Sequence, residues 1–156
     1  MSLKDIIIIL LIFLLDRVSK IYVIHLDEIL LNSEIITLKF INIKLIWNEG
    51  VAFGLFAFDD KSFYNLITGF IIIIILTLVY FIRKTRGIEK YSFIVILGGA
   101  LGNVFDRFLY SAVPDFIDIH YQNFHWFIFN VADIFITLGV ILLVYVEIFL
   151  KNKKSL

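Results

Sequence analysis

Residues 63–82 form a run of twenty positions without a single charged side chain, dominated by isoleucine, leucine and phenylalanine. An α-helix needs about 20 apolar residues to cross the hydrocarbon core of a bilayer, so this segment is predicted to span a membrane. Composition supports this prediction, because 61% of the 156 residues are hydrophobic and the mean hydropathy is +0.97. A chain this short could not bury so much apolar surface in one aqueous core.

Three further segments are predicted to span the membrane, although each carries ionisable side chains. Together with the first, the predicted spans cover residues about 4–26, 63–82, 91–109 and 131–150. The expected fold class is an all-α membrane protein with four transmembrane helices, forming a single domain over residues 1–156. The start of the chain has the pattern of a signal peptide, but Asp16-Arg17 stands where a small-residue cleavage site would follow. We therefore expect an uncleaved helix.

The distribution of lysine and arginine predicts the orientation of these spans. Four basic residues lie in the short connector 83–90, and three more follow residue 150. Segment 110–130 has none, whereas segment 27–62 carries three against six acids. Cytoplasmic loops carry an excess of Lys and Arg. We therefore expect both termini and residues 83–90 in the cytoplasm, and the two longer connections outside.

The first external segment is too long to be a simple connection and is expected to contain a small extracytoplasmic β-sheet between the first two helices. Apolar and polar residues alternate from Ile36 to Phe40, and the phase of the alternation reverses from Ile41 to Leu45. Because a slip of one residue moves every side chain to the other face, a turn or bulge is expected near this reversal. Two short strands are thus predicted between about residues 34 and 48. Four aromatic residues are expected at the membrane interface, namely Trp47, Phe53, Phe56 and Phe58.

Six ionisable residues are predicted to lie at a similar depth, near the outer leaflet. At a helical rise of about 1.5 Å per residue, this layer contains Asp16, Lys20, Asp106, Arg107, Asp115 and Asp133. Charged groups at membrane depth are costly and are usually functional. Asp16 and Lys20 also have the i,i+4 spacing of an ion pair within one helix. The layer is therefore a candidate site, in which Asp16 and Lys20 are expected to form a structural ion pair.

Other polar and small residues in the predicted spans have different expected roles. Asn103 and Asn130 carry amides that need polar partners next to lipid, so a role in the site is expected for both. Gly98, Gly99 and Gly102 are expected to let helices pack closely rather than to bind a ligand.

Paired carboxylates are the catalytic groups that fit this chain best. The absence of cysteine excludes thiol catalysis and disulfides, and no Gly-x-Ser-x-Gly motif or phosphate-binding loop is present. His25, His120 and His125 lack carboxylate or cysteine partners at metal-ligand spacing, so no metal and no cofactor is predicted. A net charge of zero gives no case for a nucleic-acid partner. Asp118 is expected to be a surface acid in the external loop 110–130.

Five segments of the chain resemble, in order, the motif blocks of the lipoprotein signal peptidase (signal peptidase II) family. The segments are Asp16-Arg17-Val18-Ser19-Lys20, Asn48-Glu49-Gly50-Val51-Ala52-Phe53, Gly99-Ala100-Leu101-Gly102-Asn103-Val104-Phe105-Asp106-Arg107, Pro114-Asp115-Phe116-Ile117-Asp118 and Phe129-Asn130-Val131-Ala132-Asp133. The resemblance covers nearly the whole chain. It implies an aspartic endopeptidase of the bacterial cytoplasmic membrane that cuts diacylglyceryl-modified prolipoproteins before the lipidated cysteine. Prolipoprotein substrates and membrane lipids are the implied partners, with no cofactor.

By motif position, the resemblance implies that Asp115 and Asp133 form the catalytic pair. It places eight further residues around the site: Asp16, Lys20, Asn48, Gly50, Asn103, Arg107, Asn130 and Ala132. Two positions depart from the family pattern, because Arg17 stands where glutamine is usual and Pro114 where valine is usual. Proline restricts the backbone of the residue before it as well as its own. Pro114 is therefore expected to alter the approach to Asp115 while leaving the carboxylate in place.

Two other functions remain open at this point. A small four-helix proton-coupled transporter would also use a carboxylate within the membrane, but such acids usually lie near the midplane and the loops are short. A non-catalytic membrane scaffold would not need two aspartates that are each flanked by specific motif residues. The outward position of the acids favours a peptidase with its active site towards the outer face.

Overall fold

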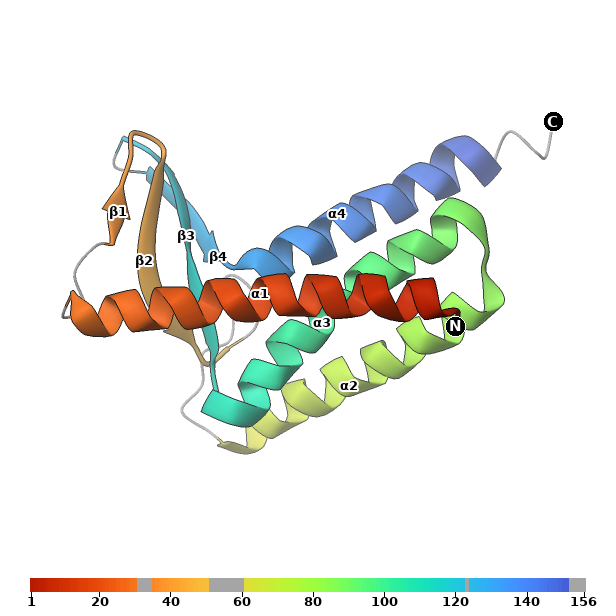
Figure 1. Ribbon diagram of the computed structural model, residues 1–156, viewed down its shortest axis with the longest axis horizontal. Coiled ribbons are helices and arrows are strands. Elements are labelled where there is room, and N and C mark those ends of the chain that lie inside the picture. The colour runs from red at the N-terminus through yellow and green to blue at the C-terminus, as the bar shows by residue number, and fades with distance from the viewer. Residues whose placement is uncertain (31–34, 51–60, 123, 152–156) are drawn as a thin grey trace.

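The computed structural model describes residues 1–30, 35–50, 61–122 and 124–151 (Figure 1). The described helices are α1 Leu3–Ile29, α2 Lys61–Lys84, α3 Gly87–Tyr110 and α4 Val131–Tyr145, which continues into a π-helical segment, Val146–Lys151. The described strands are β1 Ile36–Thr37, β2 Ile41–Asn48, β3 Val113–Tyr121 and β4 Phe124–Phe129. In Figure 1 the sheet stands at one end of the helices, beside the start of α4, while the N-terminus and the connection between α2 and α3 lie at the other end.

Three of the described helices are long and apolar enough to cross a membrane. The qualifying segments are Asn65–Lys84, Gly87–Tyr110 and Val131–Leu150. Helix α1 has sufficient length, at 27 residues, but Asp16, Arg17 and Lys20 interrupt its apolar sequence. These three side chains are buried, whereas Leu15 and Val18 on the same helix are more than half exposed. The charges of α1 therefore face the other helices, and its outer side is apolar.

Helix α3 lies at the centre of the described helices, where it contacts α1, α2 and α4. Its glycines allow the neighbouring backbones to come close. A Cβ atom added at Gly99 would lie 2.5 Å from the carbonyl oxygen of Ala132, at the start of α4. One added at Gly98 would lie 2.8 Å from the Cβ atom of Ile12 on α1. The expectation that these two glycines permit close helix packing is confirmed.

The sheet is antiparallel, with strand order β1-β2-β3-β4. Strands β1 and β2 lie within the segment predicted to contain two strands. The backbone N–H of Leu38 donates to the carbonyl oxygen of Ile41 at 3.0 Å, so the reversal of the apolar alternation marks the turn between them. Trp47 at the end of β2 is 42% exposed, and its ring meets that of Tyr110 edge to face. The other predicted interface residues, Phe53, Phe56 and Phe58, lie outside the described residues.

The prediction that residues 110–130 form a loop is wrong. This segment forms β3 and β4, so the sheet combines both long connections instead of belonging only to the one between α1 and α2. β2 pairs with β3 through distant partners such as Ile43 and Ile117. A local pattern cannot reveal such pairing, because the pairing depends on which remote segment lies alongside. Pro114 is the second residue of β3 and precedes the pairing with β4, where its missing N–H interrupts no β3–β4 hydrogen bond.

Candidate active site

A cavity of about 490 Å³ lies between α2, α3 and α4, beside the end of β2 and the start of β3. Near the sheet its lining is polar and consists of Asn48, Asn103, Arg107, Asp115, Asn130 and Asp133. Farther along the helices the lining is apolar apart from Thr137, and includes Ile71, Ile74, Ile96, Ala100, Ile136, Val140 and Ile141. The polar set contains six of the ten residues that the sequence placed at or around a site.

Asp115 lies near the start of β3, is only 4% exposed and is held by two amides. The Nδ2 atom of Asn48 donates to its Oδ2 at 2.8 Å, and the Nδ2 atom of Asn130 donates to its Oδ1 at 2.6 Å. The pKa of Asp115 is raised to about 6, mainly because burial disfavours the charged carboxylate. The hydrogen bonds from Asn48 and Asn130 lower this pKa, and the nearby charge of Asp133 raises it. The carboxyl group is therefore able to hold or release a proton near neutral pH.

Asp133 lies in the first turn of α4, and its position follows from how this helix begins. Asn130 is the N-cap residue, and its Oδ1 atom accepts a hydrogen bond from the Asp133 backbone N–H at 3.1 Å. In return, the Asn130 backbone N–H donates to the Asp133 carboxylate at 3.2 Å, which completes a capping box. The Nδ2 atom of Asn103 on α3 donates to the other carboxylate oxygen at 2.8 Å. Asn130 therefore contacts both aspartates.

A buried lysine lies behind Asp133 and orients Asn103. The Lys20 ammonium contacts Asn103 Oδ1 at 2.8 Å, Asp106 at 2.7 Å and Asp16 at 2.9 Å, and its side chain is fully buried. Three acceptors match the three N–H donors of an ammonium group. Because lysine can only donate, the amide oxygen of Asn103 must face it, and the amide nitrogen is left to face Asp133. The predicted ion pair between Asp16 and Lys20 is present, and it belongs to this larger network.

A family model described as Signal peptidase (SPase) II matches residues 8–149. The chain belongs to the signal peptidase II family. Among curated relatives, the lipoprotein signal peptidase of Pelagibacter ubique (strain HTCC1062) is 49% identical over 151 residues, covering 97% of this chain and 91% of the relative. That of Francisella tularensis subsp. novicida (strain U112) is 42% identical over 119 residues, covering 74% of each chain. The protein is therefore a peptidase, as the motif blocks indicated.

Two solved structures of bacterial membrane enzymes are similar to this fold. A bacterial membrane enzyme solved at 2.3 Å resolution has a TM-score of 0.76 and 30% identity, covering 97% of this chain and 90% of that one. A second bacterial membrane enzyme, solved at 1.9 Å, has a TM-score of 0.72 and 30% identity, covering 94% and 93%. Signal peptidase II is a membrane enzyme, in agreement with the long apolar helices of this chain.

Arg17, where this chain departs from the signal peptidase II pattern, has a specific place in the structure. Its guanidinium forms an ion pair with Asp106, which also receives the Lys20 ammonium. Arg17 additionally lies 5.2 Å from the centre of the Phe105 ring, a cation–π contact. Asp16, Arg17, Lys20 and Asp106 together balance two acids against two bases inside the protein. The ion-pair partners of Asp106 are thus Lys20 and Arg17, not Arg107, its neighbour in the sequence.

Arg107 instead reaches the segment that follows β2. Its guanidinium donates to the carbonyl oxygen of Gly50, while the Gly50 backbone N–H donates to Asn48 Oδ1 at 3.0 Å. Ala132, another residue expected around the site, is fully buried and donates its backbone N–H to Asp16 at 2.9 Å. Asp16, Lys20, Gly50 and Ala132 therefore support the residues that line the cavity without lining it themselves.

The prediction that Asp118 is a surface acid is wrong. Asp118 is 4% exposed, and its carboxylate pairs with His125 Nδ1 at 2.7 Å. His125 thus has a carboxylate partner, which the sequence spacing did not suggest. The contact forms because β3 and β4 pair antiparallel, which places His125 opposite His120, two residues from Asp118 along β3. Asp118 shares its strand with Asp115 but does not line the active-site cavity.

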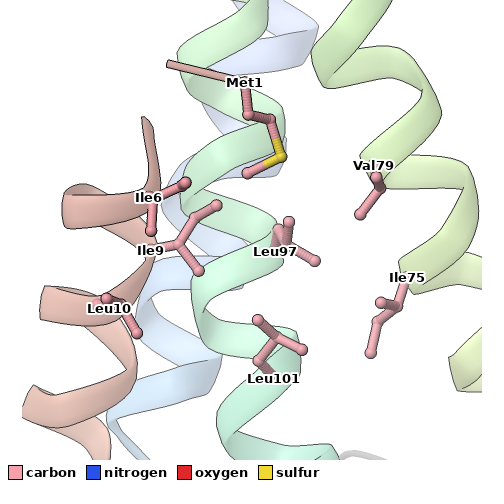
Figure 2. Close-up of a pocket in the computed structure, with 8 residues that line it drawn as sticks. All are labelled: Met1, Ile6, Ile9, Leu10, Ile75, Val79, Leu97 and Leu101. Carbon is pink, nitrogen blue, oxygen red and sulfur yellow. The ribbon is translucent and has the colours of Figure 1, made fainter. Parts of the chain in front are cut away.

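A second cavity, of about 250 Å³, has no side chain among its described lining residues that could act as an acid or a base in peptide hydrolysis (Figure 2). Figure 2 shows side chains from α1, α2 and α3 turned towards one another around it. Its lining is entirely apolar and consists of Met1, Ile6, Ile9, Leu10, Ile75, Val79, Leu97 and Leu101. The candidate catalytic groups therefore belong to the cavity between α2, α3 and α4.

Proposed function

We propose that this protein is an aspartic endopeptidase of the bacterial cytoplasmic membrane that removes signal peptides from diacylglyceryl-modified prolipoproteins, cutting just before the lipidated cysteine. The observation that carries the proposal is that Asp115 and Asp133 line one cavity and are joined through Asn130. The names of the curated relatives, lipoprotein signal peptidases, support the substrate class. The apolar walls of the cavity suit a substrate that carries acyl chains.

Asp115 and Asp133 are the proposed catalytic pair, and they share one proton. The ionised carboxylate takes a proton from the attacking water, and the protonated carboxyl group donates one to the departing amide nitrogen. Nearby like charges oppose ionisation of both groups, and the pKa of about 6 for Asp115 reflects this together with burial. The apparent pKa values of the reaction belong to the pair rather than to either residue.

The remaining site residues are proposed to position this pair. Asn48 and Asn130 hold Asp115, whereas Asn103 holds Asp133. Behind them, Lys20 holds Asn103, and Asp16 holds the backbone N–H of Ala132 and pairs with Lys20. Arg107 holds Gly50, so the segment after β2 is tied to the end of α3. A carboxylate pair held on several sides needs little rearrangement during the reaction, which favours catalysis.

We also propose that α1 is a fourth membrane span. Its 27 residues would extend about 40 Å, which exceeds the thickness of the hydrocarbon core. The buried network removes the charges of Asp16, Arg17 and Lys20 from contact with lipid. Between residues 6 and 21, the exposed residues of α1 are leucine, isoleucine and valine. Such a helix can cross a bilayer although its sequence carries several charges.

The basic residues favour an orientation with both termini in the cytoplasm. Arg83 and Lys84 end α2, and Arg86 and Lys90 lie beside the start of α3. The sheet, whose strand β3 carries Asp115, and the start of α4, which carries Asp133, lie at the opposite end of the helices (Figure 1). By the positive-inside rule, the active site would then face the outer side of the membrane.

Cleavage of a defined lipopeptide tests the proposed function. The substrate is a synthetic signal peptide that ends in a short mature sequence and carries S-diacylglyceryl cysteine at the junction. Purified protein in lipid nanodiscs should release a fragment that begins with the lipidated cysteine, as identified by mass spectrometry. The same peptide without the lipid is the matched control and should be a much poorer substrate. Cleavage at another bond, or equal cleavage of the unlipidated peptide, contradicts the proposal.

A further inference from the structure

A single hydroxyl group lies in the otherwise apolar part of the active-site cavity, on Thr137 of α4. Thr137 follows Asp133 by four residues, which places the two side chains on the same face of the helix, about 6 Å apart along its axis. Both line the cavity, but the neighbours of Thr137 are Ile136, Val140 and Ile141. The Thr137 side chain is exposed in the structure, so it is accessible from the cavity.

The Thr137 hydroxyl forms no hydrogen bond with any residue in the described part of the chain. Several other serine and threonine hydroxyls in or at the end of the helices bond to a carbonyl oxygen three or four residues earlier, as Ser19 does to Asp16. Such bonds join Thr77 to Ile73 at 2.9 Å, Thr85 to Phe81 at 2.8 Å and Ser92 to Ile88 at 3.1 Å. This local bond is the usual way for a hydroxyl in a helix to satisfy its donor. Thr137 departs from it, and its donor is available to a molecule in the cavity.

The amide donors in the polar part of the cavity are already engaged. The amide groups of Asn48 and Asn130 donate to Asp115, and that of Asn103 donates to Asp133. A lipidated substrate brings a different polar group into the apolar part, because each acyl chain begins at an ester carbonyl. When acyl chains exclude water from this region, a carbonyl without a donor is unfavourable. Thr137 is the side-chain donor among the described lining residues of this part of the cavity.

We propose that Thr137 donates a hydrogen bond to an ester carbonyl of the substrate's diacylglyceryl group and so contributes to the selection of lipidated precursors. The inference rests on the proposed function and adds a specificity residue to it. The contact is made in the bound substrate and takes no part in proton transfer. Loss of this hydrogen bond should therefore raise KM more than it lowers kcat.

Two lipopeptides with the same sequence test this inference. One carries ester-linked acyl chains on the cysteine, and the other carries ether-linked alkyl chains of equal length, which lack the carbonyl oxygens. The wild-type protein should show a KM roughly 3- to 10-fold lower for the ester, the range expected for one hydrogen bond. Thr137→Val, which keeps the shape but removes the hydroxyl, should lose this preference, and Thr137→Ser should retain it. Thr77→Val on α2 is the matched control and should behave as wild type, because Thr77 does not line the cavity.

The possible outcomes separate this inference from the proposed function. Equal KM values of the wild-type protein for the two substrates overturn the inference without involving any variant. A preference for the ester that persists in Thr137→Val overturns it as well. Failure of the wild-type protein to cleave either lipopeptide overturns the proposed function, and this inference with it.

Discussion

At the scale of single residues, one asparagine determines how the two aspartates are placed. The Asn130 amide oxygen caps α4 by accepting the backbone N–H of Asp133. Because the oxygen is used in this way, the amide nitrogen points away from the helix, and it donates to Asp115. The hydrogen bond that caps α4 therefore also orients the amide nitrogen of Asn130, which holds the Asp115 carboxylate on β3.

Replacement of either aspartate by asparagine should nearly abolish cleavage. Asparagine keeps the shape of the side chain but cannot exchange a proton with water or with the leaving amine. We expect Asp115→Asn and Asp133→Asn each to lower kcat by about 10²- to 10⁴-fold. Since the two groups act as a unit, the double variant should be little worse than either single one. The measurement is the rate of lipopeptide cleavage by purified variants, with the folded fraction checked by thermal unfolding.

Asp118→Asn is the matched control for this experiment. Asp118 and Asp115 lie on the same strand and are both 4% exposed, but Asp118 does not line the cavity. Asp118→Asn should lose stability through its contact with His125 and keep most of its activity per folded molecule. If Asp118→Asn is inactive although folded, or if Asp115→Asn keeps near-full activity, the catalytic pair has been assigned wrongly.

The raised pKa of Asp115 predicts an unusual dependence of stability on pH. Its ordinary value is 3.8 and its value in the folded protein is about 6, so between these pH values the folded state binds more protons than the unfolded state. The free energy of unfolding should therefore fall as pH rises through this window, by on the order of 2–3 kcal/mol from this residue. Thermal unfolding of wild type and Asp115→Asn, measured from pH 4 to pH 7, checks this. The difference between the two proteins should change across the window, and a constant difference would contradict the assignment.

At the scale of secondary-structure elements, the contact between α3 and α4 determines where Asp133 lies. Gly99 of α3 faces the backbone of Ala132, which immediately precedes Asp133. Gly102, one turn along, faces Asp16, which binds the Ala132 backbone N–H. Small residues at these positions let the start of α4 lie directly against α3. The spacing of the two helices therefore sets the distance between Asn103 and Asp133.

A single methyl group added where α3 contacts α4 should impair both stability and activity. In Gly99→Ala the new Cβ atom would lie 2.5 Å from the Ala132 carbonyl oxygen, so α4 must shift. We expect a loss of about 1–3 kcal/mol in the free energy of unfolding. Activity per folded molecule should fall by about tenfold or more, because small displacements of catalytic groups are costly. Thermal unfolding and initial cleavage rates measure the two effects.

Gly69→Ala on α2 is the control for a methyl group without a clash. Apart from its chain neighbours and its own helix backbone, no atom of the described residues lies within 4 Å of a Cβ atom built at this position. Stability and activity of Gly69→Ala should therefore stay close to wild type. Equal effects of the two substitutions would mean that helix flexibility, rather than the approach of α4, explains the result.

At the scale of the whole molecule, the connection between α2 and α3 and the sheet lie at opposite ends of the helices (Figure 1). The proposed orientation predicts that these ends are accessible from opposite sides of the membrane. The absence of cysteine makes single-cysteine labelling possible without removing native thiols. Ile88 and Tyr121 are suitable positions, because they are 48% and 64% exposed.

Tyr121→Cys should react with a membrane-impermeant thiol reagent in intact spheroplasts. Ile88→Cys should react only after the membrane is permeabilised, because the basic residues around it favour the cytoplasmic side. The extent of labelling is read on the purified variants by gel shift. The opposite pattern would reverse the orientation and move the proposed active site to the cytoplasmic side.

Much of the site could be predicted from the sequence because its residues lie in compact motif blocks. Six residues of these blocks line one cavity: Asn48, Asn103, Arg107, Asp115, Asn130 and Asp133. Thr137 and the α2 wall of the cavity were missed. The α2 wall, Ile71 and Ile74, has the same composition as a lipid-facing surface. A local pattern does not distinguish an isoleucine that lines a cavity from one that faces lipid.

The sequence by itself determined that this is a membrane enzyme of the signal peptidase II family, because long apolar runs and ordered motif blocks are properties of local sequence. The reversal of the apolar alternation also predicted the two strands that the structure has as β1 and β2. Only the tertiary structure decided that β3 and β4 complete the same sheet, that Asp118 is buried against His125 and that Asp106 binds Lys20 and Arg17. The physical reason is the same in each case. A buried polar group or an unpaired strand must find a partner, and which distant segment supplies it depends on how the whole chain packs.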